Sequence, residues 1–205
     1  MKKLTLLTVV LLAFSVSSFA ETMWRPVLYL GGGASVPTGN FKDGFKTGYN
    51  FASSFGFEYH SSLELLGELS YSRFPLDQTK SLATEPLGTS VDGGAARVLN
   101  IGGAVRYYFT PGSALSKFRP YILGRLGVAH LSQADMTIVG LDGTTINSFS
   151  GSTKFTYAIG AGTNIDLNRN LGLWVEGKFD GISTPLHKTD YVPIQAGIRY
   201  IFGKE

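Results

Sequence analysis

The sequence contains no cysteine among its 205 residues. It therefore has no disulfide scaffold, no thiolate-bound metal and no cysteine nucleophile. Charged residues are also scarce at 16%, whereas an ordinary soluble domain has roughly 25%. Glycine is abundant, with 26 residues, and aromatic residues make up 13% of the chain. That aromatic content argues against a disordered protein.

Hydrophobic residues form a long continuous run at the N-terminus. Residues 1–20 combine two lysines, an apolar stretch from Leu4 to Phe14 and a small-residue site that ends at Ala20. This order is that of a secretory signal peptide. A membrane anchor is the alternative, but the apolar run is shorter than the roughly 20 residues that a spanning helix needs. We therefore expect residues 1–20 to be a signal peptide and residues 21–205 to form one domain.

Removing the signal peptide lowers the formal net charge from +3 to +1, because both of its charged residues are lysines. A nearly neutral protein offers no charge-based reason to bind nucleic acid, and we expect no such partner. No later stretch reaches 18 consecutive apolar residues. The sequence therefore predicts no membrane-spanning helix.

Alternation of two kinds of side chain recurs along the rest of the chain. In residues 49–60, one face carries aromatic side chains such as Phe51 and Phe55, and the other carries small or polar ones such as Asn50 and Ala52. A period of two is that of a β-strand. We expect eight strands with this pattern, at 27–36, 49–60, 63–74, 97–109, 120–131, 154–167, 171–180 and 191–202.

The connections between these strands alternate in length. The shorter ones are 60–62, 110–118 and 168–170, and the longer ones are 37–47, 75–95, 132–152 and 181–190. Short turns at one end and longer polar loops at the other are typical of an outer-membrane barrel. The sequence therefore predicts an all-β fold, an eight-stranded antiparallel transmembrane β-barrel with an up-and-down meander.

Composition indicates which face of each strand points outward. A soluble lipocalin-like barrel, with its apolar face inside, is the alternative, but its water-facing side would be rich in Lys, Glu and Thr. Here the less apolar face is mostly Gly, Ala, Ser and Asn, which suits a narrow lumen. Aromatic residues such as Tyr107 and Phe109 at the short turns, and Tyr49 and Phe155 at the long loops, agree with the two interfacial belts of a membrane barrel.

Several segments resemble the small OmpA/OmpX-type outer-membrane barrel proteins. They are Tyr29–Gly33, Arg106–Phe109 before a Thr-Pro-Gly turn, Arg119–Tyr121 and the closing Gly197–Phe202. The resemblance implies an outer-membrane location with both termini in the periplasm. The partners it implies are outer-membrane lipids, lipopolysaccharide and the outer-membrane assembly machinery. It also implies that Tyr200 and Phe202 belong to a C-terminal assembly signal, although three residues follow the last aromatic.

Six charged residues fall on the inward face: Glu68, Arg106, Arg125, Glu176, Lys178 and Arg199. Counting from the short turns at about 3.3 Å per residue places most of them near one level. Opposite charges in a confined interior should pair, because an unpaired buried charge is costly. We interpret the six as a structural network that fills a barrel too narrow to conduct. An ion pathway gated by switching these pairs is the alternative.

One short motif deserves a catalytic test. His130-Leu131-Ser132 resembles the His-x-Ser of outer-membrane lipid A deacylases, in which Ser is the nucleophile and His the base. In that family a carboxylate follows to orient the His, whereas Thr144 stands at the equivalent position here. The other histidines, His60 and His187, lack metal-ligand spacing. We therefore predict no catalytic, metal-binding or cofactor-binding residues, and no enzymatic activity.

The sequence thus favours a structural and surface-interaction role. A rigid, monomeric barrel would present its polar loops to lipopolysaccharide, other cells or host molecules, since binding residues are often found on loops. A narrow channel for ions or small solutes through the lumen is the alternative, and a lipid A-modifying enzyme is a third, weaker one.

Overall fold

The computed structural model describes most of the chain after the predicted signal peptide. The described residues are 24–59, 62–78, 90–109, 117–140, 143–147, 151–183 and 189–203. The predicted signal peptide, His60, His187 and parts of the predicted connections lie outside them. Within this part of the chain, no helix is both long and apolar enough to cross a bilayer.

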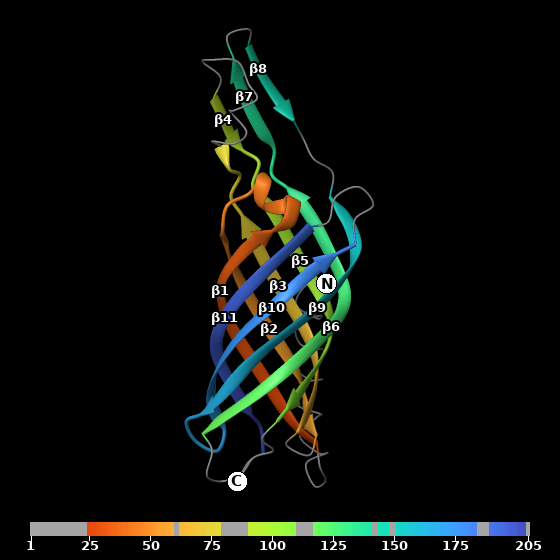
Figure 1. Ribbon diagram of the computed structural model, residues 1–205, viewed down its shortest axis with the longest axis vertical. Coiled ribbons are helices and arrows are strands. Elements are labelled where there is room, and N and C mark those ends of the chain that lie inside the picture. The colour runs from red at the N-terminus through yellow and green to blue at the C-terminus, as the bar shows by residue number, and fades with distance from the viewer. Residues whose placement is uncertain are drawn as a thin grey trace, which may run out of the picture.

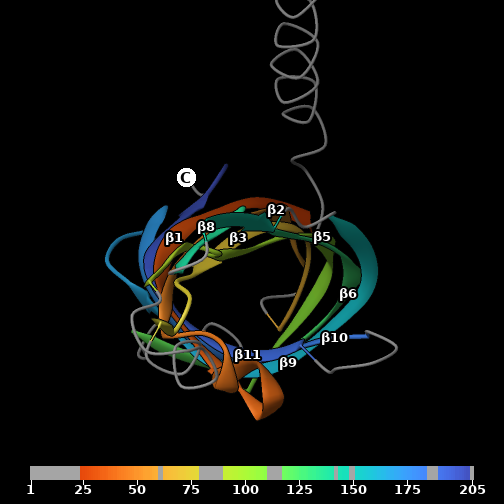
Figure 2. The ribbon, with the colours of Figure 1, turned by 90° about the horizontal axis from the view of Figure 1, so that it is seen from above.

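Eight antiparallel strands form a closed barrel, as predicted (Figure 2). In chain order they are β1 (Trp24–Thr38), β2 (Gly48–Tyr59), β3 (Leu63–Phe74), β5 (Ala96–Tyr108), β6 (Phe118–Gln133), β9 (Ser152–Asp166), β10 (Leu171–Ile182) and β11 (Thr189–Ile201). Each strand pairs with the next along this series, and β1 pairs with β11 from Val27↔Ile201 to Thr38↔Asp190. Closure leaves none of the eight strands with an unpaired edge, which a barrel in hydrocarbon requires.

The alternating pattern divides the barrel wall into two chemically different faces. Large apolar side chains such as Phe51, Ile101 and Ile159 point outward and are 62%, 59% and 65% exposed. The inward face buries most of the polar and charged side chains of the strands. The predicted orientation is therefore confirmed: the apolar face is outside and the small and polar face lines the lumen.

Three further strands rise beyond one end of the barrel (Figure 1). They are β4 (Ser90–Gly93), β7 (Met136–Gly140) and β8 (Gly143–Asn147), and they pair in the order β4-β7-β8. Loops 75–95 and 132–152, predicted as polar connections, therefore contain regular structure. The reason is that the β5–β6 pairing continues past the rim through the bonds Gly94 N–H to Asp135 O (3.1 Å) and Ala134 N–H to Ala95 O (2.9 Å). We call this end the loop end and the opposite end the turn end.

A cluster of apolar side chains fills the barrel at the loop end. Phe74 and Tyr191 are buried there with ring centroids 5.1 Å apart, and Phe41 packs edge-on against Phe74 at 4.9 Å. Phe41 belongs to η2 (Gly39–Asp43), a 3-10 helix that contacts β1 and β11. The connection 37–47, predicted as a polar loop, thus folds back and places an aromatic ring in this cluster.

Candidate functional site: an ion-pair ladder in the lumen

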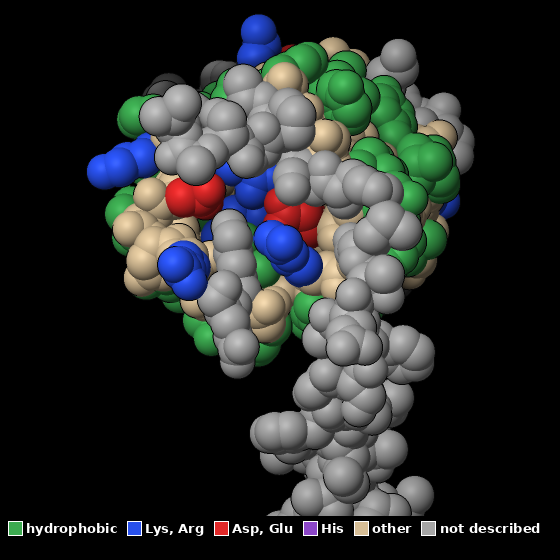
Figure 3. Space-filling model, turned by 90° about the horizontal axis from the view of Figure 1, so that it is seen from below, with side chains coloured by type: hydrophobic (Ala, Val, Ile, Leu, Met, Phe, Trp, Pro, Cys, Tyr) green, Lys and Arg blue, Asp and Glu red, His purple; other side chains and the backbone are tan. Residues whose placement is uncertain are grey.

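Charged side chains from seven strands meet inside the barrel and form a connected series of ion pairs, which we call the ion-pair ladder. It has five cations and six carboxylates, and each contact joins a cation to a carboxylate. The members are Arg119, Glu58, Arg199, Asp166, Glu64, Arg106, Glu176, Lys178, Glu68, Arg125 and Asp180. Seen from the turn end, acidic and basic side chains gather in the mouth of the barrel (Figure 3).

The ladder begins near the turn end with two arginines that share a carboxylate. Arg119 Nη2 donates to Glu58 Oε1 at 2.6 Å, and Arg199 Nη2 lies 3.4 Å from Glu58 Oε2. Arg199 also contacts Glu64 and Asp166, each at 3.1 Å. All of these side chains except Asp166 are almost completely buried. Planar guanidinium groups suit such shared carboxylates because their donors spread over a fork.

Arg106 occupies the middle of the ladder. Its Nη2 donates to Glu176 Oε2 at 2.7 Å, whereas its Nη1 is 3.9 Å from Glu64 Oε2. The guanidinium carbon also lies 4.1 Å from the ring centroid of Tyr29 and 5.0 Å from that of Tyr121. Aromatic faces attract a desolvated cation. Arg106 is therefore held by one strong ion pair and three rings, the third being that of Trp174 at 5.7 Å.

The part of the ladder nearest the loop end is built around Glu68. Lys178 Nζ and Arg125 Nη1 both donate to Glu68 Oε1, at 2.5 and 2.8 Å. Arg125 Nη2 donates to Asp180, and Lys178 Nζ lies 3.5 Å from Glu176 Oε1. Each cation of this group thus touches two carboxylates, and Glu68 is the carboxylate that joins them.

Two of the contacts are looser than the rest and divide the ladder into three compact groups. They are the 3.9 Å contact between Arg106 and Glu64 and the 3.5 Å contact between Lys178 and Glu176. The atoms concerned, Arg106 Nη1 and Glu176 Oε1, have no hydrogen-bond partner among the described residues. These two contacts are therefore ion pairs without a hydrogen bond.

Neutral polar side chains hold the ladder in position. Tyr29 donates its hydroxyl proton to Glu64 (2.7 Å to Oε2), Tyr121 donates to Glu176 (2.9 Å), and Asn164 Nδ2 donates to the Tyr108 hydroxyl (2.7 Å). A strand glycine makes room for one of these rings. A Cβ at Gly162 would lie 2.6 Å from the Tyr121 ring, so a larger residue would displace it.

The structure brings five of the six predicted lumen residues into direct contact. Arg106, Glu176, Lys178, Glu68 and Arg125 follow one another in the ladder. Arg199 makes its described ion pairs with Glu58, Glu64 and Asp166 instead. All six predicted residues are thus members of the ladder, each beside a charge of opposite sign; their common level stays a prediction.

Sequence reasoning missed five members of the ladder: Glu58, Glu64, Arg119, Asp166 and Asp180. A signal was present for most of them. Glu64 lies an even number of residues from Glu68 on the same strand, so both side chains point to the same face. The same holds for Asp180 relative to Glu176 and Lys178. Arg119 has the parity of Arg125 but lies one residue before the strand predicted at 120–131, whereas β6 begins at Phe118.

The ladder fills the lumen with groups that are costly to disturb. Removing one partner from a buried ion pair leaves an uncompensated charge, and each charge here lies beside one of opposite sign. An eight-stranded barrel has room for little more than its side chains. Together with the apolar cluster at the loop end, the ladder can act as a rigid plug.

The structure gives the His130-Leu131-Ser132 motif no catalytic arrangement. His130 is exposed on the outer wall, and its Nδ1 lies 3.0 Å from Thr153 Oγ1, its neighbour on β9. Among the described residues, no carboxylate or serine side chain is hydrogen-bonded to His130. In the described part of the chain, no group of three or more His, Asp or Glu side chains could hold a metal ion.

The two predicted assembly-signal residues lie on the outer wall at the turn end. Tyr200 and Phe202 are each 41% exposed, and their rings meet edge-to-face with centroids 4.8 Å apart. Phe202 N–H donates to Pro26 O at 2.9 Å, which ties the end of the last strand to β1.

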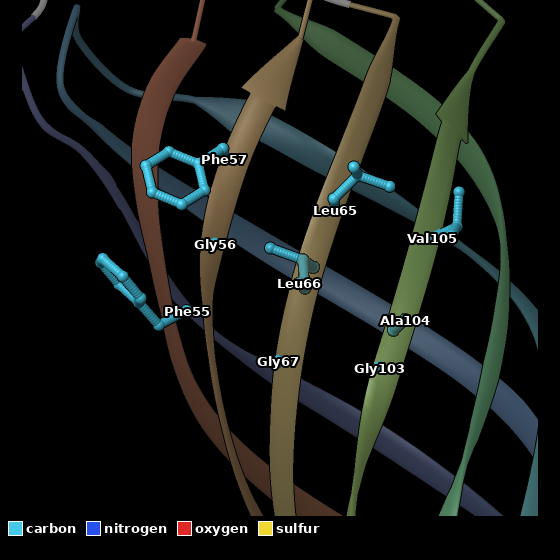
Figure 4. A pocket seen from close by; sticks show the side chains of 9 residues that line it. All are labelled: Phe55, Gly56, Phe57, Leu65, Leu66, Gly67, Gly103, Ala104 and Val105. Carbon is cyan, nitrogen blue, oxygen red and sulfur yellow. The ribbon is translucent and has the colours of Figure 1, made fainter. Parts of the chain in front are cut away.

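A shallow groove of about 520 Å³ interrupts the outer wall across β2, β3 and β5 (Figure 4). Gly67 and Gly103 lie opposite each other in the register and supply no side chains. Phe55, Leu65 and Val105 stand around this gap. The groove is apolar and lies on the outward face, so it can hold a hydrocarbon chain but is not a path through the barrel.

Comparison with known proteins places this architecture. A family model described as an outer membrane protein beta-barrel domain matches residues 6–202. The structure of neisserial surface protein A, NspA, is 14% identical, with 86% of this chain and 96% of that chain covered and a TM-score of 0.51. The structure of Ail, the attachment invasion locus protein of Yersinia pestis, is 12% identical, with 88% of this chain and 99% of that chain covered and a TM-score of 0.46. The N-terminal β-barrel domain of Pseudomonas aeruginosa OprF is 16% identical, with 88% of this chain and 98% of that chain covered and a TM-score of 0.44. No curated protein matches the chain.

Proposed function

The chain belongs to the outer membrane protein beta-barrel domain family, and from this membership we propose that it is a closed barrel that presents a binding surface outside the cell. The observation that carries the proposal is the sheet of β4, β7 and β8, which stands beyond the barrel at the loop end. A barrel that served only to fill the membrane would not need such an extension. Loops on a rigid scaffold are a common place for binding residues.

The proposal includes an orientation. We infer that residues 1–20 are a signal peptide, that both termini lie in the periplasm and that the loop end faces outward. Two features support it: the connections at the turn end are short, and the described chain begins and ends there, with Phe202 bonded to Pro26. Short periplasmic turns and longer external loops are usual in these barrels. N-terminal sequencing of the protein from outer membranes should find Glu21 as the first residue.

The lumen supports a pedestal rather than a channel. The ion-pair ladder occupies it from Arg119 to Asp180, and the cluster around Phe74 closes the loop end. An ion entering such a lumen would have to break several buried contacts at once. The channel for ions or small solutes remains the second candidate, and a conductance measurement separates the two.

The proposed partners follow from the surfaces. The apolar outer wall contacts outer-membrane lipids, and the loop end meets lipopolysaccharide and ligands on other cells or on a host. Tyr200 and Phe202 engage the outer-membrane assembly machinery. We propose a monomer, since each barrel strand already pairs with two neighbours.

Adhesion of whole cells tests the binding surface. The variant replaces residues 136–147, the β7–β8 hairpin, by a short Gly-Ser turn, and the control replaces Asn168–Asn170 at the turn end in the same way. Cells displaying each protein are scored for attachment to an epithelial monolayer and for clumping with one another. We expect the hairpin variant alone to lose attachment or clumping while keeping its heat-dependent gel mobility. Equal behaviour of all three proteins would contradict the proposal.

A further inference from the structure

Two arginines on the outer wall face each other across neighbouring strands. Arg73 of β3 and Arg97 of β5 are direct partners in the register, and both side chains are exposed. On each strand, outward apolar residues lie on the turn-end side of the arginine. Examples are Leu69 on β3 and Leu99 on β5, which are 50% and 45% exposed. Like charges directly opposite each other weaken a sheet. The pair therefore has a cost that a bound anion would remove.

The carboxylates on the neighbouring barrel strands β2 and β3 do not offset this charge. Glu58, Glu64 and Glu68, on β2 and β3, are buried in the lumen and take part in the ladder. β5 and β6 contain no acidic residue. Among the described ion pairs, none includes Arg73 or Arg97. Arg73 also forms a side-chain hydrogen bond with Tyr49. Because a guanidinium has five N–H donors, both arginines keep donors for a ligand on the outer wall.

The position of the pair indicates which anion it meets. Arg73 and Arg97 come at the loop-end limit of the apolar surface, where Tyr49, 43% exposed, is the register partner of Arg73 on β2. Tyrosines of a membrane protein concentrate at the level of the lipid headgroups. Beyond Arg97, the next strand offers the Ser132 hydroxyl in the same row. The row therefore lies where lipid phosphates are found.

We propose that Arg73 and Arg97 together bind the phosphate of a lipid headgroup in the leaflet at the loop end. Each guanidinium can donate two parallel hydrogen bonds to phosphate oxygens, and such charge-assisted bonds are strong and directional. The inference rests on the proposed orientation, under which this leaflet is the outer one and the ligand is the phosphorylated glycolipid of lipopolysaccharide.

Native mass spectrometry of the refolded protein in detergent micelles tests the site by counting bound lipid. The probes are lipid A, dephosphorylated lipid A, phosphatidylglycerol and inorganic phosphate. The test variant is Arg73→Gln/Arg97→Gln. The control, Lys117→Gln/Arg169→Gln, removes the same charge from two exposed positions at the turn end. Both variants keep the barrel strands intact, which their heat-dependent gel mobility should verify.

We expect the Arg73→Gln/Arg97→Gln variant to bind lipid A at least about 10-fold more weakly than wild type, through loss of charge-assisted bonds, and the control to bind normally. Dephosphorylated lipid A should bind wild type as weakly as lipid A binds the variant. Equal binding of lipid A by variant and wild type would overturn the site, while the adhesion result would stand. Displacement of lipid A by millimolar inorganic phosphate would overturn a lipid-specific site. Equal binding of phosphatidylglycerol would overturn the assignment of the ligand to lipid A, while the proposed orientation, which rests on the short turns and the chain ends, would stand.

Discussion

Replacing Glu68 by Gln should strongly destabilise the barrel, because Glu68 is the carboxylate that two buried cations share. Lys178 Nζ and Arg125 Nη1 lie 2.5 and 2.8 Å from the same oxygen. Breaking a buried ion pair by removing one partner costs about 3–5 kcal/mol. Here each cation keeps a second carboxylate, Asp180 or Glu176, so we expect a loss near the lower limit, about 3 kcal/mol.

Urea unfolding of the protein in lipid vesicles, followed by tryptophan fluorescence, measures this loss. The chain has two tryptophans, and Trp174 is buried in the lumen, so its emission reports on the interior. With a slope of about 1–3 kcal/mol per molar urea, the midpoint should fall by roughly 1–3 M. Asp43→Asn, which removes an exposed carboxylate from η2, should leave it unchanged.

A second variant distinguishes a broken ion pair from a general packing defect. Glu68→Gln/Lys178→Met removes both charges of the 2.5 Å contact. It should be destabilised by clearly less than the sum of the two single variants, because no uncompensated charge remains at that contact. An unchanged midpoint for Glu68→Gln, or strictly additive losses in the double variant, would refute the ladder as a source of stability.

Three other changes test separate parts of the structure. Gly162→Ala should cost about 1–3 kcal/mol because its Cβ would lie 2.5 Å from the Val175 carbonyl oxygen and 2.6 Å from the Tyr121 ring. Gly124→Ala, which meets open space, is the control, and equal stability of the two variants would contradict the packing. Phe41→Ala should loosen the loop-end cluster and speed amide exchange there, at a cost below the roughly 3–5 kcal/mol of a fully buried Phe; unchanged exchange would count against it. Phe202→Ala should slow the appearance of the heat-resistant form in pulse-labelled cells, and normal kinetics would exclude a role in assembly.

The barrel could be predicted from the sequence because its wall has two chemically different faces. Residues 49–60 were expected as a strand and form β2, Gly48–Tyr59, since aromatic residues recur at every second position there except at Ser53. Continuous alternation predicts both the strand and the side that meets the bilayer. The β4-β7-β8 sheet could not be found in this way. It extends the β5–β6 hairpin past the rim through pairs such as Gly93↔Met136, and nothing in the local sequence of either segment indicates that pairing.

The ladder shows the same limit. The two-residue alternation along each strand placed Glu68 and Arg125 in the lumen. Which charges touch one another depends on how the strands are staggered. Arg119 and Glu58 pair across 61 residues of sequence, and nothing local to either residue indicates this. Phe41 illustrates the opposite error: in a loop rich in polar residues it was expected to be external, yet Phe74 and Tyr191 give it an apolar neighbourhood.

Single-channel recording of the wild-type protein in a planar bilayer tests most directly whether the lumen is closed. With the ladder and the loop-end cluster in place, we predict no resolved conductance steps across the voltage range in which the bilayer is stable. The Glu68→Gln variant, recorded in parallel, should show openings if its loosened ladder lets ions pass. Regular, uniform steps from the wild-type protein would contradict the pedestal and establish the channel in its place.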